Sequence, residues 1–162
     1  MDSKQIALRL LLDELGVEPK IKTVAQRKTL QKSVYIGQLA GVDFGYRYNW
    51  YVMGPYSPGL TRDYYALDRA VASSHGGDVA KHHELRPSIR RRLARVKPLL
   101  DVPAGLDVDQ ADWLELVASV HYLIVERKKK KRDARKVLKN AKPHVADHMD
   151  EALNQLRALD LV

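Results

Sequence analysis

Cysteine is absent from the 162-residue chain, and so is any long hydrophobic run. Without cysteine the protein has no disulfides, iron–sulfur clusters or thiolate zinc sites, which suits a reducing cytoplasm. No stretch of about 18 uncharged apolar residues occurs, so we expect no transmembrane helix. Charged side chains between Lys4 and Glu14 interrupt the first apolar stretch, so we expect no signal peptide. These absences predict a cytoplasmic protein that does not bind membranes.

Recognisable catalytic motifs are missing as well. The chain has no Gly-rich phosphate loop, no dinucleotide-binding fingerprint and no nucleophile elbow. We interpret His121, within an apolar run, as a structural histidine bonded to a backbone carbonyl rather than a catalytic base. His144 and His148 could share a helix face, with Asp147 or Asp150 as a further metal ligand, but their spacing matches no established motif. We therefore predict no metal, no other cofactor and no enzymatic activity.

A metal-dependent nuclease using Asp63, Asp68 and Glu115 is the least favoured hypothesis. Such nucleases need carboxylates gathered around one or two cations. Asp63 and Asp68 are five positions apart and do not share a helix face well.

Amphipathic helical patterns are what the chain does contain. Apolar spacing and helix boundary signals predict helices over residues 3–15, 29–40, 58–73, 87–100, 109–127, 131–140 and 145–159. Residues 73–85 are polar and Gly-rich, and we expect a loop or a hairpin tip there. We predict a mainly α fold, a compact helical domain of five to seven helices with one short extended, wing-like segment. It divides into a helical core, 1–126, and a basic C-terminal extension, 127–162, packed on or linked to that core.

The extended segment is expected within residues 44–53, where aromatic residues alternate with other types. We place Tyr46, Tyr48 and Trp50 on the face toward the core and Arg47 and Tyr51 on the opposite face. Aromatic side chains of this kind can stack on nucleobases. Arg47 and Tyr51 are the contacts that we expect if nucleic acid binds this segment. The Pro- and Gly-containing segment that follows, 54–59, predicts a rigid turn.

Positive charge is concentrated in two segments. The net charge is +8, but residues 86–97 carry +6 and residues 127–142 carry +9, which leaves −7 for the remainder. Uncompensated basic runs attract phosphate backbones or acidic protein surfaces. We predict that the following residues bind nucleic acid or an acidic protein partner: Arg86, Arg90, Arg91, Arg92, Arg95, Arg127, Lys128, Lys129, Lys130, Lys131, Arg132, Arg135, Lys136 and Lys139.

A two-part motif resembles a known prokaryotic family. The stretch Lys28–Tyr35 (KTLQKSVY), followed by Gly54–Leu60 (GPYSPGL), is similar to a signature of the YwgA-like uncharacterised proteins and the related SocA-like (Panacea) antitoxin domains. Weaker similarity lies at Trp113–Leu123 and after Lys142-Pro143-His144. The resemblance implies action by protein contact rather than by catalysis.

From the residues themselves, we interpret this motif as structural. Gln31 and Lys32 can bond across to the turn, while its other members pack or shape the chain. The motif residues that we assign to architecture are Leu30, Gln31, Lys32, Tyr35, Trp50, Gly54, Pro55, Tyr56, Ser57 and Pro58.

Two functional hypotheses follow. The first is a non-catalytic binding or regulatory module, antitoxin-like or associated with nucleic acid, that acts through its basic surfaces. The second is a protein-interaction scaffold in a prokaryotic defence or mobile-element assembly.

Overall fold

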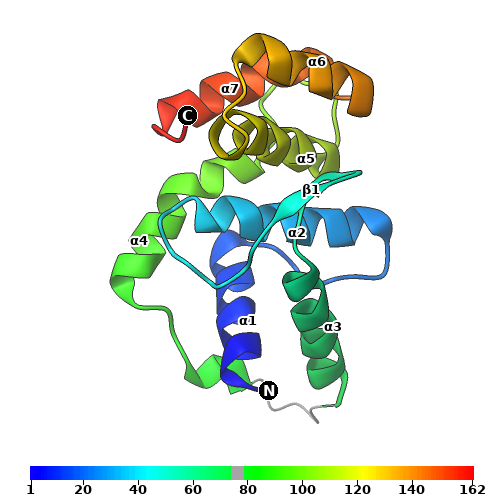
Figure 1. The fold of residues 1–162 in the computed structure, drawn as a ribbon. Helices are drawn as coiled ribbons and strands as arrows, with labels where there is room; N and C mark the ends of the chain where they lie inside the picture. The colour runs from blue at the N-terminus through cyan, green and yellow to red at the C-terminus, as the bar shows by residue number, and fades with distance from the viewer. Residues whose placement is uncertain (74–78) are drawn as a thin grey trace.

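The computed structural model describes residues 1–73 and 79–162, and it is mainly helical (Figure 1). Seven α-helices and one two-stranded hairpin lie in these residues, which confirms the predicted fold class. Short 3₁₀ or π turns, labelled η, connect several of them. The elements in chain order are α1 (Ser3–Leu15), α2 (Val24–Gln38), β1 (Asn49–Tyr51), β2 (Gly54–Tyr56), α3 (Pro58–Ser73), η1 (Val79–His82), α4 (Pro87–Val96), η2 (Lys97–Leu100), α5 (Gln110–His121), η3 (Tyr122–Glu126), α6 (Lys131–Ala141), η4 (Ala146–His148) and α7 (Met149–Ala158).

Helices α2 and α5 form the centre of the molecule. They pack against each other, with α1 beneath α2 and α7 against the other side of α5 (Figure 1). One buried apolar cluster extends from Leu8 of α1 through Trp113 of α5 to Leu138 of α6 and Leu156 of α7. The helices after residue 126 therefore share a core with those before it. None of the described helices is long and apolar enough to cross a membrane.

Capping residues set the starts of the first two helices, and one of these starts differs from the prediction. Helix α1 spans the predicted residues 3–15, and the side chain of Asp2 caps it by accepting the backbone N–H of Gln5 at 2.9 Å. Helix α2 begins at Val24 rather than at residue 29, because Thr23 and Gln26 form a capping box. Each of these pairs satisfies backbone donors that the first turn of a helix leaves free.

The predicted rigid turn at residues 54–59 is wrong in its first half. Gly54–Tyr56 instead forms β2, which pairs antiparallel with β1, and the reversal lies at Val52 and Met53. Proline is tolerated in β2 because a two-stranded hairpin does not need every backbone donor. Gly54 has a φ of 83°, and a Cβ there would lie 2.4 Å from Ser119 Oγ. Only glycine allows this strand to approach α5 so closely.

The long predicted helix at 109–127 divides into two parts. Helix α5 starts after Asp109, whose side chain accepts the backbone N–H of Asp112 at 2.8 Å, and it continues into the π turn η3. A π turn inserts one extra residue per turn and is often found at functional positions. The predicted loop at 73–85 includes residues 74–78, which lie outside the described part of the chain, and η1, which is followed by irregular chain up to α4.

Candidate functional site

A cluster of ionic side chains lies buried between α2, α5 and the segment after α6. Its centre is Glu115, which is 2% exposed. Lys28 Nζ donates to Glu115 Oε2 at 2.7 Å and to Asp112 Oδ1 at 2.5 Å. Lys142, which is fully buried, donates from Nζ to Glu115 Oε1 at 2.7 Å. We call Lys28, Lys32, Asp112, Glu115 and Lys142 the buried ionic cluster. Each carboxylate oxygen of Glu115 has its own ammonium partner.

The same cluster fastens the hairpin to the helices. Lys142 Nζ donates to the carbonyl oxygen of Val52 at 2.6 Å, and Lys32 Nζ donates to that of Pro55 at 2.5 Å. The Trp50 ring lies 5.4 Å from Lys142 Nζ, within the range of a cation–π contact. Buried charges are costly unless they are paired and hydrogen-bonded. These contacts therefore satisfy the lysines and hold the hairpin against α5 at the same time.

Gln31 joins α2 to the chain that follows the hairpin. Its amide nitrogen donates to the carbonyl oxygen of Ser57 at 2.9 Å, and its amide oxygen accepts the backbone N–H of Ser57 at 3.0 Å. Ser57 Oγ in turn accepts the N–H of Leu60 at 3.2 Å, at the start of α3. The prediction that Gln31 and Lys32 bond across to the Gly54–Pro58 segment is confirmed.

Neighbouring charges shift pKa values within the cluster in opposite directions. Burial alone would lower the pKa of Lys28 and raise that of Glu115. The hydrogen bonds of Lys28 to Asp112 and Glu115, and of Lys142 to Glu115, outweigh burial, so the pKa of Lys28 is raised and that of Glu115 is lowered. Lys32 forms no ion pair with any described residue, and burial lowers its pKa to about 7. Lys32 is therefore the member that titrates near neutral pH.

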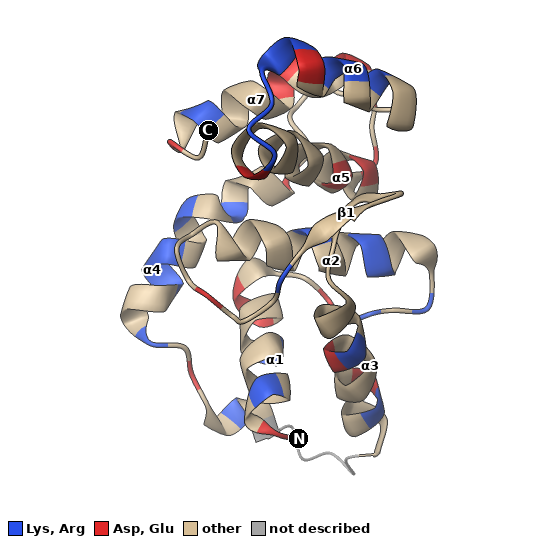
Figure 2. Cartoon of the chain, in the orientation of Figure 1, with Lys and Arg blue, Asp and Glu red and all other residues tan. Residues whose placement is uncertain are grey.

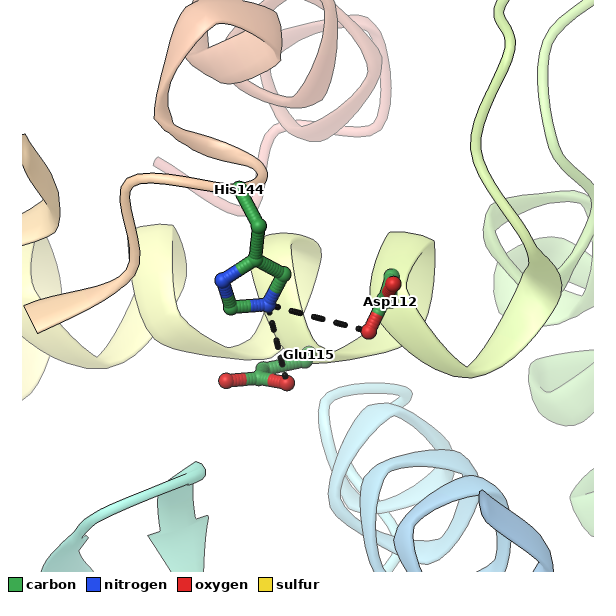
Figure 3. A group of neighbouring side chains, drawn as sticks. All are labelled: Asp112, Glu115 and His144. Atoms are coloured by element: carbon green, nitrogen blue, oxygen red, sulfur yellow. Dashed lines mark ion pairs between the residues drawn. The ribbon is translucent and has the colours of Figure 1, made fainter.

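Three side chains at this site carry atoms that could bind a metal ion. Asp112, Glu115 and His144 place one ligand atom each within 4.8 Å of one another (Figure 3). His144 Nε2 lies 3.7 Å from Asp112 Oδ1 and 3.8 Å from Glu115 Oε2. The ammonium of Lys28 is bonded to these same two oxygens, so a cation would have to displace it. We therefore interpret the two carboxylates as partners of Lys28 within the buried ionic cluster rather than as metal ligands.

This grouping differs from the arrangement considered for the histidines in the sequence. His144 lies beside α5 and not in a set with His148 and Asp147. Asp150 instead forms ion pairs with Lys131 and Arg135. Its Oδ1 lies 2.7 Å from Lys131 Nζ and 2.9 Å from Arg135 Nη2.

His121 is buried, but its partner is not the predicted backbone carbonyl. Its Nδ1 lies 2.7 Å from the hydroxyl oxygen of Tyr35, on α2. Burial lowers the pKa of His121 to about 4, so the imidazole is neutral at pH 7 and can accept the hydroxyl proton. The pair links α2 to α5 inside the core.

The three acids of the nuclease hypothesis do not come together. Asp63 pairs with Lys4 of α1 at 3.2 Å, and Asp68 is exposed on α3. Glu115 lies on a different helix, α5, where Lys28 and Lys142 enclose it. Within residues 1–73 and 79–162, no group of three potential metal ligands includes Asp63 or Asp68.

The first basic segment lies on α4, and several of its arginines bond within the molecule. Three of them contact other parts of the chain: Arg90 pairs with Glu14, Arg92 donates to Gly41 O and Arg95 donates to Leu159 O. Arg86 and Arg91 are exposed and form no ion pair with the described residues. Helix α4 therefore uses much of its charge to dock against α1 and the C-terminal end of α7.

The second basic segment begins with a connector, Arg127–Lys130, which joins η3 to α6 (Figure 2). Its backbone is bonded to the preceding turn: Arg127 N–H donates to Tyr122 O, and Lys129 N–H donates to Leu123 O, both at 2.9 Å. The guanidinium of Arg127 lies 5.7 Å from the centre of the Tyr122 ring. The connector is thus a fixed turn whose side chains point outward.

Helix α6 continues this positive surface. Arg132, Lys136 and Lys139 share one exposed face, while Leu138 faces the core. We call the connector together with these three residues the basic surface. Five of its lysines are exposed and have no ion-pair partner among the described residues: Lys128, Lys129, Lys130, Lys136 and Lys139. Lys142 closed the basic run in the sequence, but it belongs to the buried ionic cluster instead.

The hairpin meets the basic surface through Trp50. As predicted, Tyr46, Tyr48 and Trp50 face inward while Arg47 and Tyr51 are exposed. Arg47 pairs with Asp43, and the Tyr51 ring packs 5.1 Å from that of Tyr56. On the other face, Trp50 lies 5.9 Å from Tyr122 and lines a groove with Arg127 and Lys129. Trp50 is therefore the hairpin aromatic that the fold brings to the connector.

Glu115 and Lys142 are the residues whose partnership the sequence did not reveal. Glu115 is the single acid in the apolar stretch 113–125, and an acid on a buried helix needs a cationic partner. The need for a cationic partner could therefore be predicted from the sequence. The sequence does not identify which of the 28 Lys and Arg residues is that partner. Comparisons of the chain with protein-family models, curated proteins and solved structures give no match.

Proposed function

We propose that this chain is a non-catalytic, cytoplasmic binding module that recognises nucleic acid through its basic surface. The observation that carries the proposal is the set of five exposed lysines on the connector and α6 that form no ion pair with any residue that the structure describes. A solvated helix face normally carries acids beside its lysines, whereas the one acid of α6, Asp133, pairs with Arg132. Such a surface attracts the phosphate backbone and releases its counterions.

The resemblance to SocA-like (Panacea) and YwgA-like proteins supports a regulatory, antitoxin-like role within this proposal. The motif residues that carry it lie in the buried ionic cluster and around the hairpin, where they form packing and hydrogen-bond contacts. A binding module needs such a scaffold to present its surface, and it needs no catalytic group.

Fluorescence anisotropy with labelled oligonucleotides at low salt tests the proposal. The test variant changes Lys128, Lys129 and Lys130 to Gln, and the control changes the exposed Lys22, Arg62 and Arg69 to Gln. Both variants lose the same net charge, so a difference between them reports on position and not on overall charge. We expect wild type and control to bind and the test variant to bind at least tenfold more weakly, since each phosphate contact contributes to affinity.

An acidic protein is the other partner class to which this surface is suited, and labelled polyglutamate in the same assay tests it. Binding of polyglutamate but not of DNA or RNA would replace nucleic acid with an acidic protein partner. Equal losses in the test and control variants would contradict the assignment of the basic surface.

A further inference from the structure

We infer that the groove between the hairpin and the connector binds a base of single-stranded nucleic acid. The groove has a volume of about 340 Å³ and is lined by Trp50, Leu123, Arg127, Lys129 and Val137. We call it the base groove. This inference rests on the proposed function, because it specifies which form of nucleic acid the basic surface takes.

Four segments build the base groove, and β1 is distant in sequence from the other three, which follow one another along the chain. Trp50 comes from β1, Leu123 from η3, Arg127 and Lys129 from the connector and Val137 from α6. Its volume lies at the lower end of the range of small-ligand pockets. It is thus suited to a single planar group rather than to a large ligand.

The side chains that line the base groove match the two halves of a nucleotide. The half-buried Trp50 indole, with Leu123 and Val137, offers an aromatic and apolar wall for a base. Arg127 and Lys129 supply cations for the attached phosphates. This combination of ring and cation is how proteins bind single strands without reading their sequence. Bases inside a duplex are stacked on each other and cannot enter.

The walls of the groove are fixed by contacts within the protein. Lys142 bonds to the Val52 carbonyl and lies under the Trp50 ring, so the buried ionic cluster sets the position of the indole. Lys129 is held by its backbone bond to Leu123, and Arg127 by its position over Tyr122. Binding to a preformed groove avoids the entropic cost of ordering it.

An acidic protein segment fits this groove less well. Carboxylates would pair with Arg127 and Lys129, but they would leave the Trp50 ring without a planar partner. The lysines of the basic surface outside the groove can pair with phosphates and with carboxylates alike. Within the groove, the lining by Trp50 adds a ring on which a planar base can stack. The presence of Trp50 therefore favours a nucleotide.

Binding of oligo-dT, oligo-U and a DNA duplex of equal length to three proteins tests the inference. The proteins are wild type, Trp50→Leu and Tyr65→Leu, the last a control that removes an exposed aromatic side chain on α3, away from the basic surface. We expect Trp50→Leu to weaken single-strand binding by about 5- to 150-fold, the range for loss of one base–aromatic stack. Duplex binding should change less than twofold, and Tyr65→Leu should leave both unchanged. The two oligomers show whether DNA or RNA is preferred.

Two measurements on the wild-type protein guard against misfolding of the variant. Trp113 is fully buried, so quenching of tryptophan fluorescence by oligo-dT or oligo-U reports on Trp50. Photo-crosslinking of a 5-iodouracil oligomer, followed by mass spectrometry, should identify the peptide that contains Trp50.

The outcomes separate this inference from the proposed function. Equal binding of single strands and duplex, unquenched fluorescence and no effect of Trp50→Leu would overturn the base groove while the basic surface stands. Absence of any nucleic-acid binding by the wild type would overturn both.

Discussion

Lysine occurs in two opposite environments in this protein. In the buried ionic cluster, Lys28 and Lys142 are bonded to Glu115, and Lys142 is entirely enclosed. On the basic surface, Lys128 to Lys130 are exposed and have no ion-pair partner among the described residues. The positive charge of the chain therefore divides by burial into a structural part and a part available for binding. The Trp50 ring lies between the two, in contact with Lys142 and beside Arg127.

Removal of the central buried charge should have the largest effect on stability. Glu115→Gln leaves Lys28 and Lys142 without their shared anion, and breaking a buried ion pair in this way costs about 3–5 kcal/mol. Asp150→Asn is the matched control, because it removes the exposed partner of Lys131 and Arg135 and should cost about 1 kcal/mol or less. Urea unfolding of both variants measures the difference. Equal costs would mean that burial does not distinguish the two regions.

The close approach of the hairpin to α5 predicts a somewhat smaller effect. Gly54→Ala introduces a Cβ at 2.4 Å from Ser119 Oγ on a backbone with positive φ. Gly45 has the same φ of 83° but no atom within 4 Å, so Gly45→Ala isolates the backbone strain. We expect about 1 kcal/mol of destabilisation for Gly45→Ala and about 2–4 kcal/mol for Gly54→Ala, where overpacking adds to strain. Similar values for the two would show that β2 does not press against Ser119.

The pH dependence of stability should differ between buried and exposed lysines. The pKa of Lys32 is about 7 in the folded protein and 10.5 in the unfolded chain. Between these values the unfolded chain binds the extra proton, so the free energy of unfolding rises with pH across this window. Between pH 7.5 and 9.5, we expect the free energy of unfolding of the wild type to increase, relative to that of Lys32→Met, by about 1 kcal/mol per pH unit.

The control for this measurement is Lys139→Met, a substitution on the exposed face of α6. The difference in free energy of unfolding between Lys139→Met and the wild type should stay constant over the same pH range. If Lys32→Met behaves in the same way, Lys32 keeps an ordinary pKa and the hairpin contact leaves it solvated.

Neutralisation of the connector should have the smallest effect on folding. Lys128→Gln, Lys129→Gln and Lys130→Gln together remove no ion pair with any described residue, and surface changes of this kind alter stability by about 0.5 kcal/mol or less each. Thermal unfolding of this triple variant should coincide with that of the wild type within a few degrees. A large decrease would place these lysines among the structural ones.

Much of the fold was predictable because periodicity and caps act locally. The apolar stripe of residues 3–15 and the proline at the start of 58–73 predicted α1 and α3 with the bounds that the structure shows. The start of α2 was missed because the Thr23–Gln26 capping box precedes the apolar pattern. The division of 109–127 into α5 and η3 left no recognised local signal, since the apolar run continues through both.

The candidate site was predictable in its exposed half only. The run Lys128–Lys130 belongs to a segment, 127–142, in which ten Lys and Arg residues face one acid, so its exposure followed from composition. Lys142 ended that same run, yet the fold places it beside Glu115, which is 27 positions away. Likewise, Trp50 and Arg127 share a groove through tertiary packing alone. Pairings between distant positions depend on topology, which the local patterns do not specify.

The salt dependence of nucleic-acid affinity tests the central division most directly. Anisotropy titrations with oligo-dT over a range of NaCl concentrations give the slope of log K against log [NaCl] for the wild type and the Lys128–Lys130 triple Gln variant. Each phosphate contact to a single strand contributes about −0.7 to this slope, so we predict a slope shallower by about 2 in the variant, with unfolding unchanged. An unchanged slope, or a loss of stability in its place, would contradict the assignment of the exposed lysines to binding.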